Sequence, residues 1–203
     1  MKQDIILAGV GGQGILSIAF VIASAALEDG LEVKQAEVHG MSQRGGAVQS
    51  HLRLSQERIF SDLIPKGEAD LILSVEPLEA LRYVQYLRPD GMVVSSRAPF
   101  VNIPDYPEQE TILSQIRKVG RHVIVDSEKL AREAGSSLTQ NMVMLGAASR
   151  FLLVKEDRLL KFIKVLFERR GESLVTANTK AFELGRRASG GADFRPAPGG
   201  LRQ

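Results

Sequence analysis

Apolar residues in this chain fall into short hydrophobic runs that alternate with longer segments of helical periodicity. Short runs that are rich in β-branched residues and end at glycine or polar residues are typical of buried strands. The run at 47–54 alternates apolar and polar positions, which predicts a less buried strand. The six runs predict strands at residues 4–8, 31–38, 47–54, 69–75, 92–96 and 122–125.

The remaining periodic segments predict helices, several of which have clear end signals. Asp29-Gly30 stops the first helix, and Pro77 suits the first turn of another. Asp126 resembles an N-cap residue, and Arg88-Pro-Asp-Gly91 has the composition of a turn. Helices are predicted at 15–28, 77–87, 111–118, 129–134, 141–153, 155–169 and 173–187.

The order of these elements indicates the fold class. Strands and helices alternate over the first two-thirds of the chain, and helices dominate the last third. This order predicts an α/β fold with a doubly wound, mostly parallel sheet and a helical C-terminal region. We expect a single domain at residues 1–188 and a flexible tail, rich in glycine, proline and arginine, at 189–203.

Composition excludes several classes of function. The chain has 203 residues, 44% of them hydrophobic and 25% charged, and its net charge is +2. No block of five or six like charges occurs, so we do not infer nucleic-acid binding. No apolar run approaches the ~18 residues of a membrane span, and the N-terminus has no signal-peptide pattern. We therefore expect a cytoplasmic protein.

The absence of cysteine is the most restrictive feature of the composition. It excludes disulfides, Cys-ligated zinc or iron–sulfur clusters, and thiol catalysis. If the protein takes part in electron transfer, the metal centres belong to another chain. His39, His51 and His122 have no ligand-like spacing, and we expect His51 at an outward or edge position, as a structural or solvated histidine. No catalytic constellation and no metal site are predicted.

A glycine-rich loop separates the first predicted strand from the first helix. Its sequence, Gly9-Val-Gly-Gly-Gln-Gly14, matches the dinucleotide-binding pattern between a strand and a helix, and its candidate residues are Gly11, Gly12, Gln13 and Gly14. The N-terminus of the helix presents free amides to a phosphate. Glu37 lies roughly where a dinucleotide site carries the acid for the ribose hydroxyls, although the loop that follows would crowd the adenosine half. Three interpretations stay open: a nicotinamide or flavin site, a tight turn required by packing, and recognition of another group such as a phosphate or a partner chain.

A second loop, between the second and third predicted strands, combines one fixed cation with two glycines. Arg44 carries a guanidinium fork suited to a carboxylate or phosphate, and the glycines beside it permit open backbone angles. Loops that follow neighbouring strands leave an α/β sheet at one edge, so we expect both loops to meet there, close to the end of the fourth predicted strand. The candidate ligand- or partner-facing residues are His39, Met41, Ser42, Gln43, Arg44, Gly45, Gly46 and, at that strand end, Glu76.

The two loops together resemble a known family. Gly9-Val-Gly-Gly-Gln-Gly-Ile15 combined with Glu37-Val-His-Gly-Met-Ser-Gln-Arg-Gly-Gly46 is similar to the gamma-type subunits of 2-oxoacid:ferredoxin oxidoreductases, and within them to the indolepyruvate branch. The resemblance covers residues 3–187, and either loop alone would not be specific. Three later segments also resemble the family: Ser74-Val-Glu-Pro-Leu-Glu-Ala80, Asn141-Met-Val-Met-Leu-Gly146 and Asn178-x-x-Ala-Phe-x-x-Gly185.

The resemblance implies a role within a larger enzyme. The family oxidatively decarboxylates 2-oxoacids to acyl-CoA and passes the electrons to ferredoxin. Thiamine diphosphate and [4Fe–4S] clusters are expected on the partner, a large alpha subunit in the indolepyruvate branch, and this chain binds no cofactor alone. The resemblance implies a structural or regulatory subunit that docks on this partner, with the Arg44 loop facing the partner or coenzyme A.

Alternatives remain at this point. The 2-oxoacid is an arylpyruvate in the leading interpretation, and pyruvate, 2-oxoglutarate or a branched-chain 2-oxoacid in a second one. A free-standing NAD(P)-dependent oxidoreductase would use the glycine loop for its cofactor. A small regulatory domain that binds a ligand and has no large partner is the third class.

Overall fold

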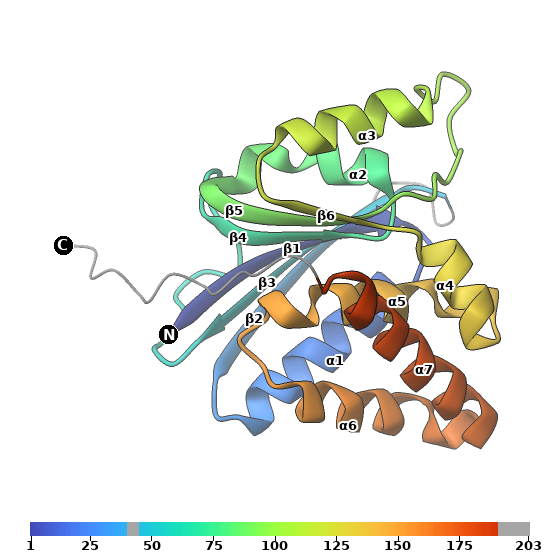
Figure 1. Cartoon of the computed structure of the whole chain (residues 1–203). Coiled ribbons are helices and arrows are strands. Elements are labelled where there is room, and N and C mark those ends of the chain that lie inside the picture. Colours follow the sequence, from blue (N-terminus) through green and yellow to red (C-terminus); the bar gives the residue numbers. More distant parts are fainter. Residues whose placement is uncertain (40–44, 191–203) are drawn as a thin grey trace.

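A six-stranded mixed sheet lies between two layers of helices in the computed structural model, which describes residues 1–39 and 45–190 (Figure 1). The strand order is β2-β3-β1-β4-β5-β6. Strands β1, β4, β5 and β6 run parallel to one another, whereas β3 is antiparallel to both of its neighbours. The strands are β1 (Lys2–Val10), β2 (Glu32–His39), β3 (Ala47–Ser55), β4 (Ala69–Ser74), β5 (Leu87–Ser96) and β6 (His122–Val125).

Helices cover both faces of the sheet, which confirms the predicted doubly wound α/β fold. Helices α2 and α3 lie above the sheet in Figure 1, and the other five lie below it. None of the helices in the described ranges is long and apolar enough to cross a membrane. The helices are α1 (Ile15–Glu28), α2 (Pro77–Arg82), α3 (Gln109–Lys118), α4 (Ser127–Ala134), α5 (Gln140–Ala148), α6 (Glu156–Phe167) and α7 (Glu172–Ala188), with 3-10 turns η1 (Val84–Tyr86), η2 (Ser137–Thr139), η3 (Ser149–Phe151) and η4 (Glu168–Arg170).

Strand β1 divides the core into two parts because successive side chains point to opposite faces. Ile5 and Leu7 belong to the larger cluster, under α1 and α5, whereas Ile6 belongs to the cluster under α2 and α3. All three side chains are fully buried. The continuous apolar run of β1 is therefore required by a strand that is covered on both faces.

Two glycines allow α5 and α7 to pack in close contact. A Cβ atom added to Gly146 would lie 1.9 Å from the carbonyl oxygen of Phe182, and one added to Gly185 would lie 1.9 Å from that of Val143. Helix α7 thus packs on α5 backbone against backbone, which no larger residue allows at either position. This contact joins the helical C-terminal region to the sheet.

Some local predictions were wrong. The predicted helix 77–87 ends at Arg82 and continues as η1, and the helix predicted at 141–153 ends at Ala148. The turn predicted at Arg88–Gly91 lies within β5, where its residues form an irregularity in the pairing with β4. The proline and the glycine of this segment are accommodated in a β-bulge and do not reverse the chain direction.

Strand β3 is more buried than its alternating sequence predicts, because β3 lies inside the sheet and the 56–68 segment packs on one of its faces. His51 is only 3% exposed, so its predicted outward or edge position was wrong, although its role is structural. Its Nδ1 atom accepts a hydrogen bond of 3.0 Å from the Ile64 amide. Burial, the main cause, lowers the pKa of His51, and the nearby Arg53 charge lowers it further.

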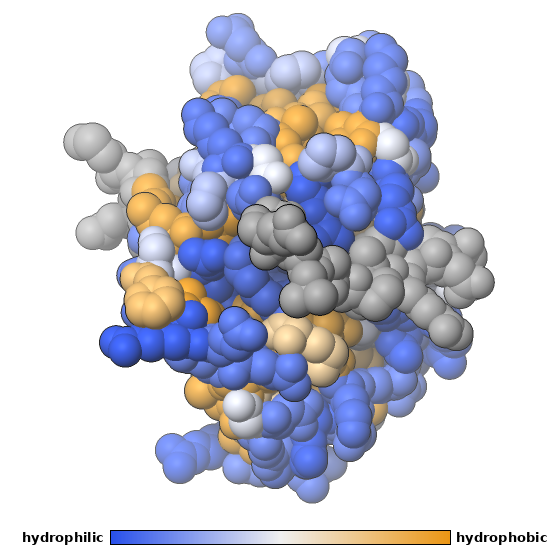
Figure 2. All heavy atoms as spheres, turned by 90° about the vertical axis from the view of Figure 1, so that its left-hand side faces the viewer, coloured by the Kyte–Doolittle hydropathy of each residue, from blue (hydrophilic) through white to orange (hydrophobic). Residues whose placement is uncertain are grey.

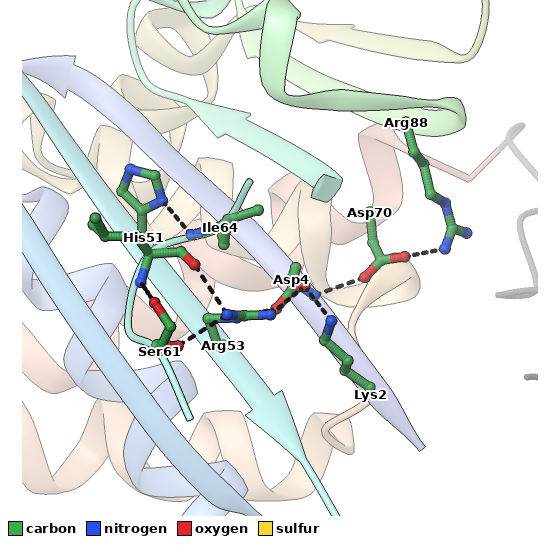
Figure 3. Close-up of polar contacts among 9 residues, drawn as sticks. Lys2, Asp4, His51, Arg53, Ser61, Ile64, Asp70 and Arg88 are labelled. Atoms are coloured by element: carbon green, nitrogen blue, oxygen red, sulfur yellow. Dashed lines mark hydrogen bonds and ion pairs between the residues drawn. The ribbon is translucent and has the colours of Figure 1, made fainter. Parts of the chain in front are cut away.

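A buried ion pair made by Arg53, two positions after His51 on β3, holds the same 56–68 segment (Figure 3). The Arg53 guanidinium donates to both carboxylate oxygens of Asp4, at 2.8 and 3.1 Å. Its Nη1 atom donates to the carbonyl oxygens of Ser61 and Leu63, each at 2.9 Å. Asp70 continues the network by accepting from the Asp4 amide at 2.6 Å and pairing with Arg88, and burial raises the Asp70 pKa.

This network lies where the parallel strands begin, which we call the amino edge. Asp4 and Asp70 stand near the starts of β1 and β4. Figure 2 shows this side of the molecule, where hydrophilic atoms predominate and hydrophobic atoms are visible in an upper patch and in further patches at the left and below. The opposite side, where the parallel strands end, is the carboxyl edge and holds the glycine loops.

Candidate functional site

The carboxyl edge brings the two glycine loops into contact. The Gly11 amide donates to the Gly46 carbonyl oxygen at 2.9 Å. The side-chain amide of Asn102, in the segment after β5, donates to the Gly45 carbonyl oxygen at 2.6 Å. Met41, Ser42, Gln43 and Arg44 lie outside the described residues, as does the side chain of His39, whose backbone ends β2.

The first glycine loop is held by its own glutamine and by α5. The side-chain oxygen of Gln13 accepts from the Val10 amide at 2.8 Å, which closes the turn. Gly14 has a φ of 77°, and a Cβ atom there would lie 2.4 Å from Nδ2 of Asn141. Gly12 has a φ of 101° with open space around it. Packing therefore explains Gly14, whereas Gly12 is free to face a ligand or a partner.

Two of the helices that begin at this edge follow the central strands β1 and β4, and their N-termini differ. Glu76 caps α2 by accepting from the Glu79 amide at 2.8 Å. Helix α1 follows Gly14 and has no side-chain cap and no acidic residue in its first turn. Since first-turn amides lack partners within a helix, the start of α1 is the better of the two positions for an external acceptor.

Glu76 uses its carboxylate within the chain. It is 1% exposed, and the Phe100 amide and the Tyr106 hydroxyl both donate to its Oε1 atom. These bonds pin the 97–108 segment to the start of α2, and burial, helped by the Glu76 charge, raises the pKa of Tyr106. The geometry favours Glu76 as a helix-entry residue that shapes the edge. Tyr106 and Asn102 were missed in the sequence because neither belongs to a recognisable spacing.

Large apolar side chains are exposed around the same edge. Leu16 stands in the first turn of α1, Val38 near the end of β2, and Leu138 in η2 just before α5. Monomeric proteins rarely expose apolar side chains in a group unless the group is an interaction site. The exposed fractions are 52% for Leu16, 54% for Val38, 42% for Phe100, 68% for Val101 and 86% for Leu138.

The sheet order argues against a dinucleotide site. In dinucleotide-binding folds the second strand lies beside the first, so its terminal acid reaches the ribose. Here β3 lies between β1 and β2, which moves Glu37 two strand spacings, about 10 Å, away from β1. The G-x-G-x-x-G pattern therefore lacks the acidic partner that a nicotinamide or flavin site requires.

The carboxyl ends of β1 and β4 lie at a topological switch point of the sheet. The chain leaves β1 toward β2 and β3 on one side and reaches β4 and β5 on the other, so the direction of winding changes there. Ligands of open α/β sheets bind at such a point, outside the carboxyl ends of the strands. Gly11–Gly14 follow β1 at this point, and Glu76 lies just after β4.

Comparisons with known proteins agree on one family. The family model described as "Pyruvate ferredoxin/flavodoxin oxidoreductase" matches residues 4–188. The chain is 37% identical to the indolepyruvate oxidoreductase subunit IorB of Thermococcus kodakarensis, over 93% of this chain and 97% of the relative. It is 35% identical to the IorB subunit of Methanothermobacter thermautotrophicus, over 91% and 96% of the two chains.

Solved structures share the fold. Subunit PORC of the pyruvate oxidoreductase from Thermotoga maritima superposes with a TM-score of 0.71 at 23% identity, over 92% of this chain and 96% of that subunit. The 2-oxoglutarate:ferredoxin oxidoreductase of Magnetococcus marinus, solved with 2-oxoglutarate, coenzyme A and succinyl-CoA bound, gives a TM-score of 0.77 at 23% identity. That match covers 95% of this chain but 32% of the other, so the present chain spans about a third of its length.

Proposed function

The chain belongs to the pyruvate ferredoxin/flavodoxin oxidoreductase family, and from this premise we propose that it is the smaller subunit of a 2-oxoacid:ferredoxin oxidoreductase that acts on arylpyruvates such as indolepyruvate. The complex oxidatively decarboxylates the 2-oxoacid to an acyl-CoA and passes the electrons to ferredoxin. The arylpyruvate substrate rests on relatives named indolepyruvate oxidoreductase subunits, which match this chain over nearly their whole length.

In this proposal the chain does not carry the redox chemistry. It has no cysteine, so [4Fe–4S] clusters held by cysteine must lie on another polypeptide. We assign the clusters and thiamine diphosphate to a large alpha subunit. This chain then acts by docking on the alpha subunit and shaping the approach to its active centre.

The docking role is supported by the contacts that hold the carboxyl edge together. Both glycine loops and the segment after β5 are tied together there by the Gly11–Gly46 and Asn102–Gly45 hydrogen bonds. Exposed apolar side chains and the uncapped start of α1 surround these bonds. A rigid, partly apolar edge with free amides suits a protein interface that also borders an anionic co-substrate.

We assign the loop around Arg44 to the side that faces coenzyme A or the partner. A guanidinium binds phosphate oxygens in a bidentate manner, and Gly45 and Gly46 let the backbone come close. If Arg44→Ala left both assembly with the alpha subunit and the KM for coenzyme A unchanged, this assignment would be wrong.

The docking edge is tested with charge substitutions on the anaerobically co-expressed complex. Leu16→Asp and Leu138→Asp place a carboxylate on the carboxyl edge at exposed positions, and an Asp in the first turn of α1 is compatible with the helix. Phe60→Asp is the matched control, because Phe60 is 85% exposed and lies in the connection between β3 and β4, on the amino side.

We expect the two edge variants to reduce co-purification of the alpha subunit at least tenfold and the Phe60 variant to leave it unchanged. Activity of the complex, followed as 2-oxoacid- and coenzyme A-dependent reduction of ferredoxin, should fall in parallel. Equal assembly of all three variants would show that the partner docks elsewhere.

A further inference from the structure

A solvent-open pocket lies at the β6 side of the sheet, between β6 and α3. Its volume is about 470 Å³, within the usual range for small-molecule sites. Strand β6 is the last strand in the described sheet. The pocket is lined by Arg97, Leu113, Arg117, His122, Ile124 and Asp126.

The pocket contains one guanidinium, that of Arg97, which the described part of the fold does not otherwise use. The backbone of Arg97 is fixed on two sides, since its amide donates to the Val125 carbonyl oxygen at 2.8 Å and its carbonyl oxygen accepts from Gln109 Nε2 at 2.7 Å. Within the described part of the chain, its guanidinium has no ion pair and no hydrogen bond. An anchored backbone that carries a free guanidinium is suited to binding an external anion.

The other charged groups leave the pocket a positive balance. Arg117 pairs with Glu110, but both side chains are about half exposed, and exposed ion pairs add little stability. Asp126 uses Oδ1 to cap α4, accepting from the Lys129 amide at 3.0 Å, so the start of that helix compensates its charge. His122 contacts the Gly120 carbonyl oxygen through Nδ1 at 2.8 Å, so its Nδ1–H is used within the chain.

The lining also has an apolar part. Ile124 is half-buried and packs against the core under α2 and α3, whereas Leu113 is 1% exposed and offers almost no surface to the pocket. A simple inorganic anion would leave this apolar surface without a contact. An anion carried on a hydrocarbon or aromatic group would cover the exposed part of Ile124 while its oxygens meet the guanidinium groups.

We propose that this pocket binds a small organic oxyanion, a carboxylate or a phosphate borne on an apolar body. Arg97 and Arg117 bind the oxyanion, and Ile124 contacts the apolar body. The pocket contains none of the glycine-loop residues, although Arg97 begins the segment after β5 that also reaches the carboxyl edge.

Titration calorimetry on the full chain, alone and in the anaerobic complex, tests the site with phenyl phosphate, phenylacetate and inorganic phosphate at low salt. We expect saturable binding of an aromatic anion and weaker binding of inorganic phosphate. A preference for phenyl phosphate or for phenylacetate identifies the oxyanion as phosphate or carboxylate. Arg97→Gln should raise the dissociation constant about tenfold, and Arg117→Gln should raise it as well.

Arg169→Gln is the matched control, because Arg169 is an exposed arginine on η4 that does not line the pocket. It should bind the aromatic anions as the unmodified chain does, and thermal unfolding should confirm that all three variants are folded. The proposal is overturned if neither aromatic anion binds saturably, if Arg97→Gln and Arg169→Gln bind alike, or if inorganic phosphate binds as tightly as the aromatic anions.

Discussion

The ion pair between Arg53 and Asp4 shows how much one polar residue organises in this fold. Arg53 is 8% exposed and Asp4 is 1% exposed, so both charges are shielded from water. The guanidinium also satisfies two backbone carbonyl groups of the segment between β3 and β4. Sequence alone does not reveal this pair, because 49 positions separate the two residues and only the register of β1 with β3 places them side by side.

Removing Arg53 should be costly. Arg53→Ala leaves Asp4 buried with Lys2 as its remaining ion-pair partner, and it removes the donor of the Ser61 and Leu63 carbonyl groups. We expect the free energy of unfolding to fall by about 3–5 kcal/mol, measured by urea denaturation. Arg132→Ala, which breaks an exposed pair with Glu128, should cost less than about 1 kcal/mol. Equal losses would contradict the structural role of Arg53.

His51 should make stability depend on pH. Its Nδ1 atom accepts from the Ile64 amide, so the folded protein holds the neutral ring, and its pKa lies below the ordinary value of 6.5. The unfolded chain therefore binds a proton at higher pH than the folded chain does. The stabilisation is present above pH 6.5 and is lost as the pH falls toward the lowered pKa of the folded state.

The comparison that isolates this effect is with His51→Asn, whose side-chain oxygen replaces Nδ1 as an acceptor but does not titrate. Between about pH 8 and pH 5.5, the unmodified chain should lose more unfolding free energy than the variant. The difference in unfolding free energy between the two proteins should therefore become smaller as the pH falls. Chemical denaturation of both proteins at each pH measures these unfolding free energies. Parallel pH curves for the two proteins would show that His51 contributes nothing.

At the scale of elements, strong local signals were sufficient for many boundaries. Helix α1 spans Ile15–Glu28 and β6 spans His122–Val125, both as predicted, because a glycine loop, an Asp-Gly stop and an Asp cap mark their ends. Burial was harder to predict, since β3 is covered by a segment without regular structure. The close contact of α5 with α7 also has no periodic signature beyond Gly146 and Gly185 themselves.

Replacing Gly146 or Gly185 with a larger residue should weaken the packing of α7 on α5. Gly146→Ala and Gly185→Ala each force a methyl group against a backbone carbonyl of the facing helix, and we expect each to lower the unfolding free energy by about 3 kcal/mol. Gly30→Ala is the control, because Gly30 has a φ of 77° but open space, so only about 1–2 kcal/mol of backbone strain results. If the helix variants were no less stable than the control, the packing of α7 on α5 would differ from that described.

For the whole molecule, the family resemblance of the two loops together predicted the fold and the place in a complex, which the G-x-G-x-x-G pattern of the first loop alone did not. The fold and the place in an oxidoreductase complex are confirmed by the relatives and the sheet, and the two loops do meet at one edge. The insertion of β3 between β1 and β2 was not predictable, because a hairpin of β2 and β3 can place either of its strands beside β1. That insertion is what removes Glu37 from a dinucleotide site.

The most direct test of the account is the activity of the complex purified anaerobically through a tag on this chain. We predict a large, cysteine-rich partner that contains thiamine diphosphate and iron, and ferredoxin reduction that requires an arylpyruvate and coenzyme A. The chain alone should show neither this activity nor saturable NADH binding. Recovery of the chain alone or as a homo-oligomer, or a partner without thiamine diphosphate, would contradict the assignment of this chain as an oxidoreductase subunit.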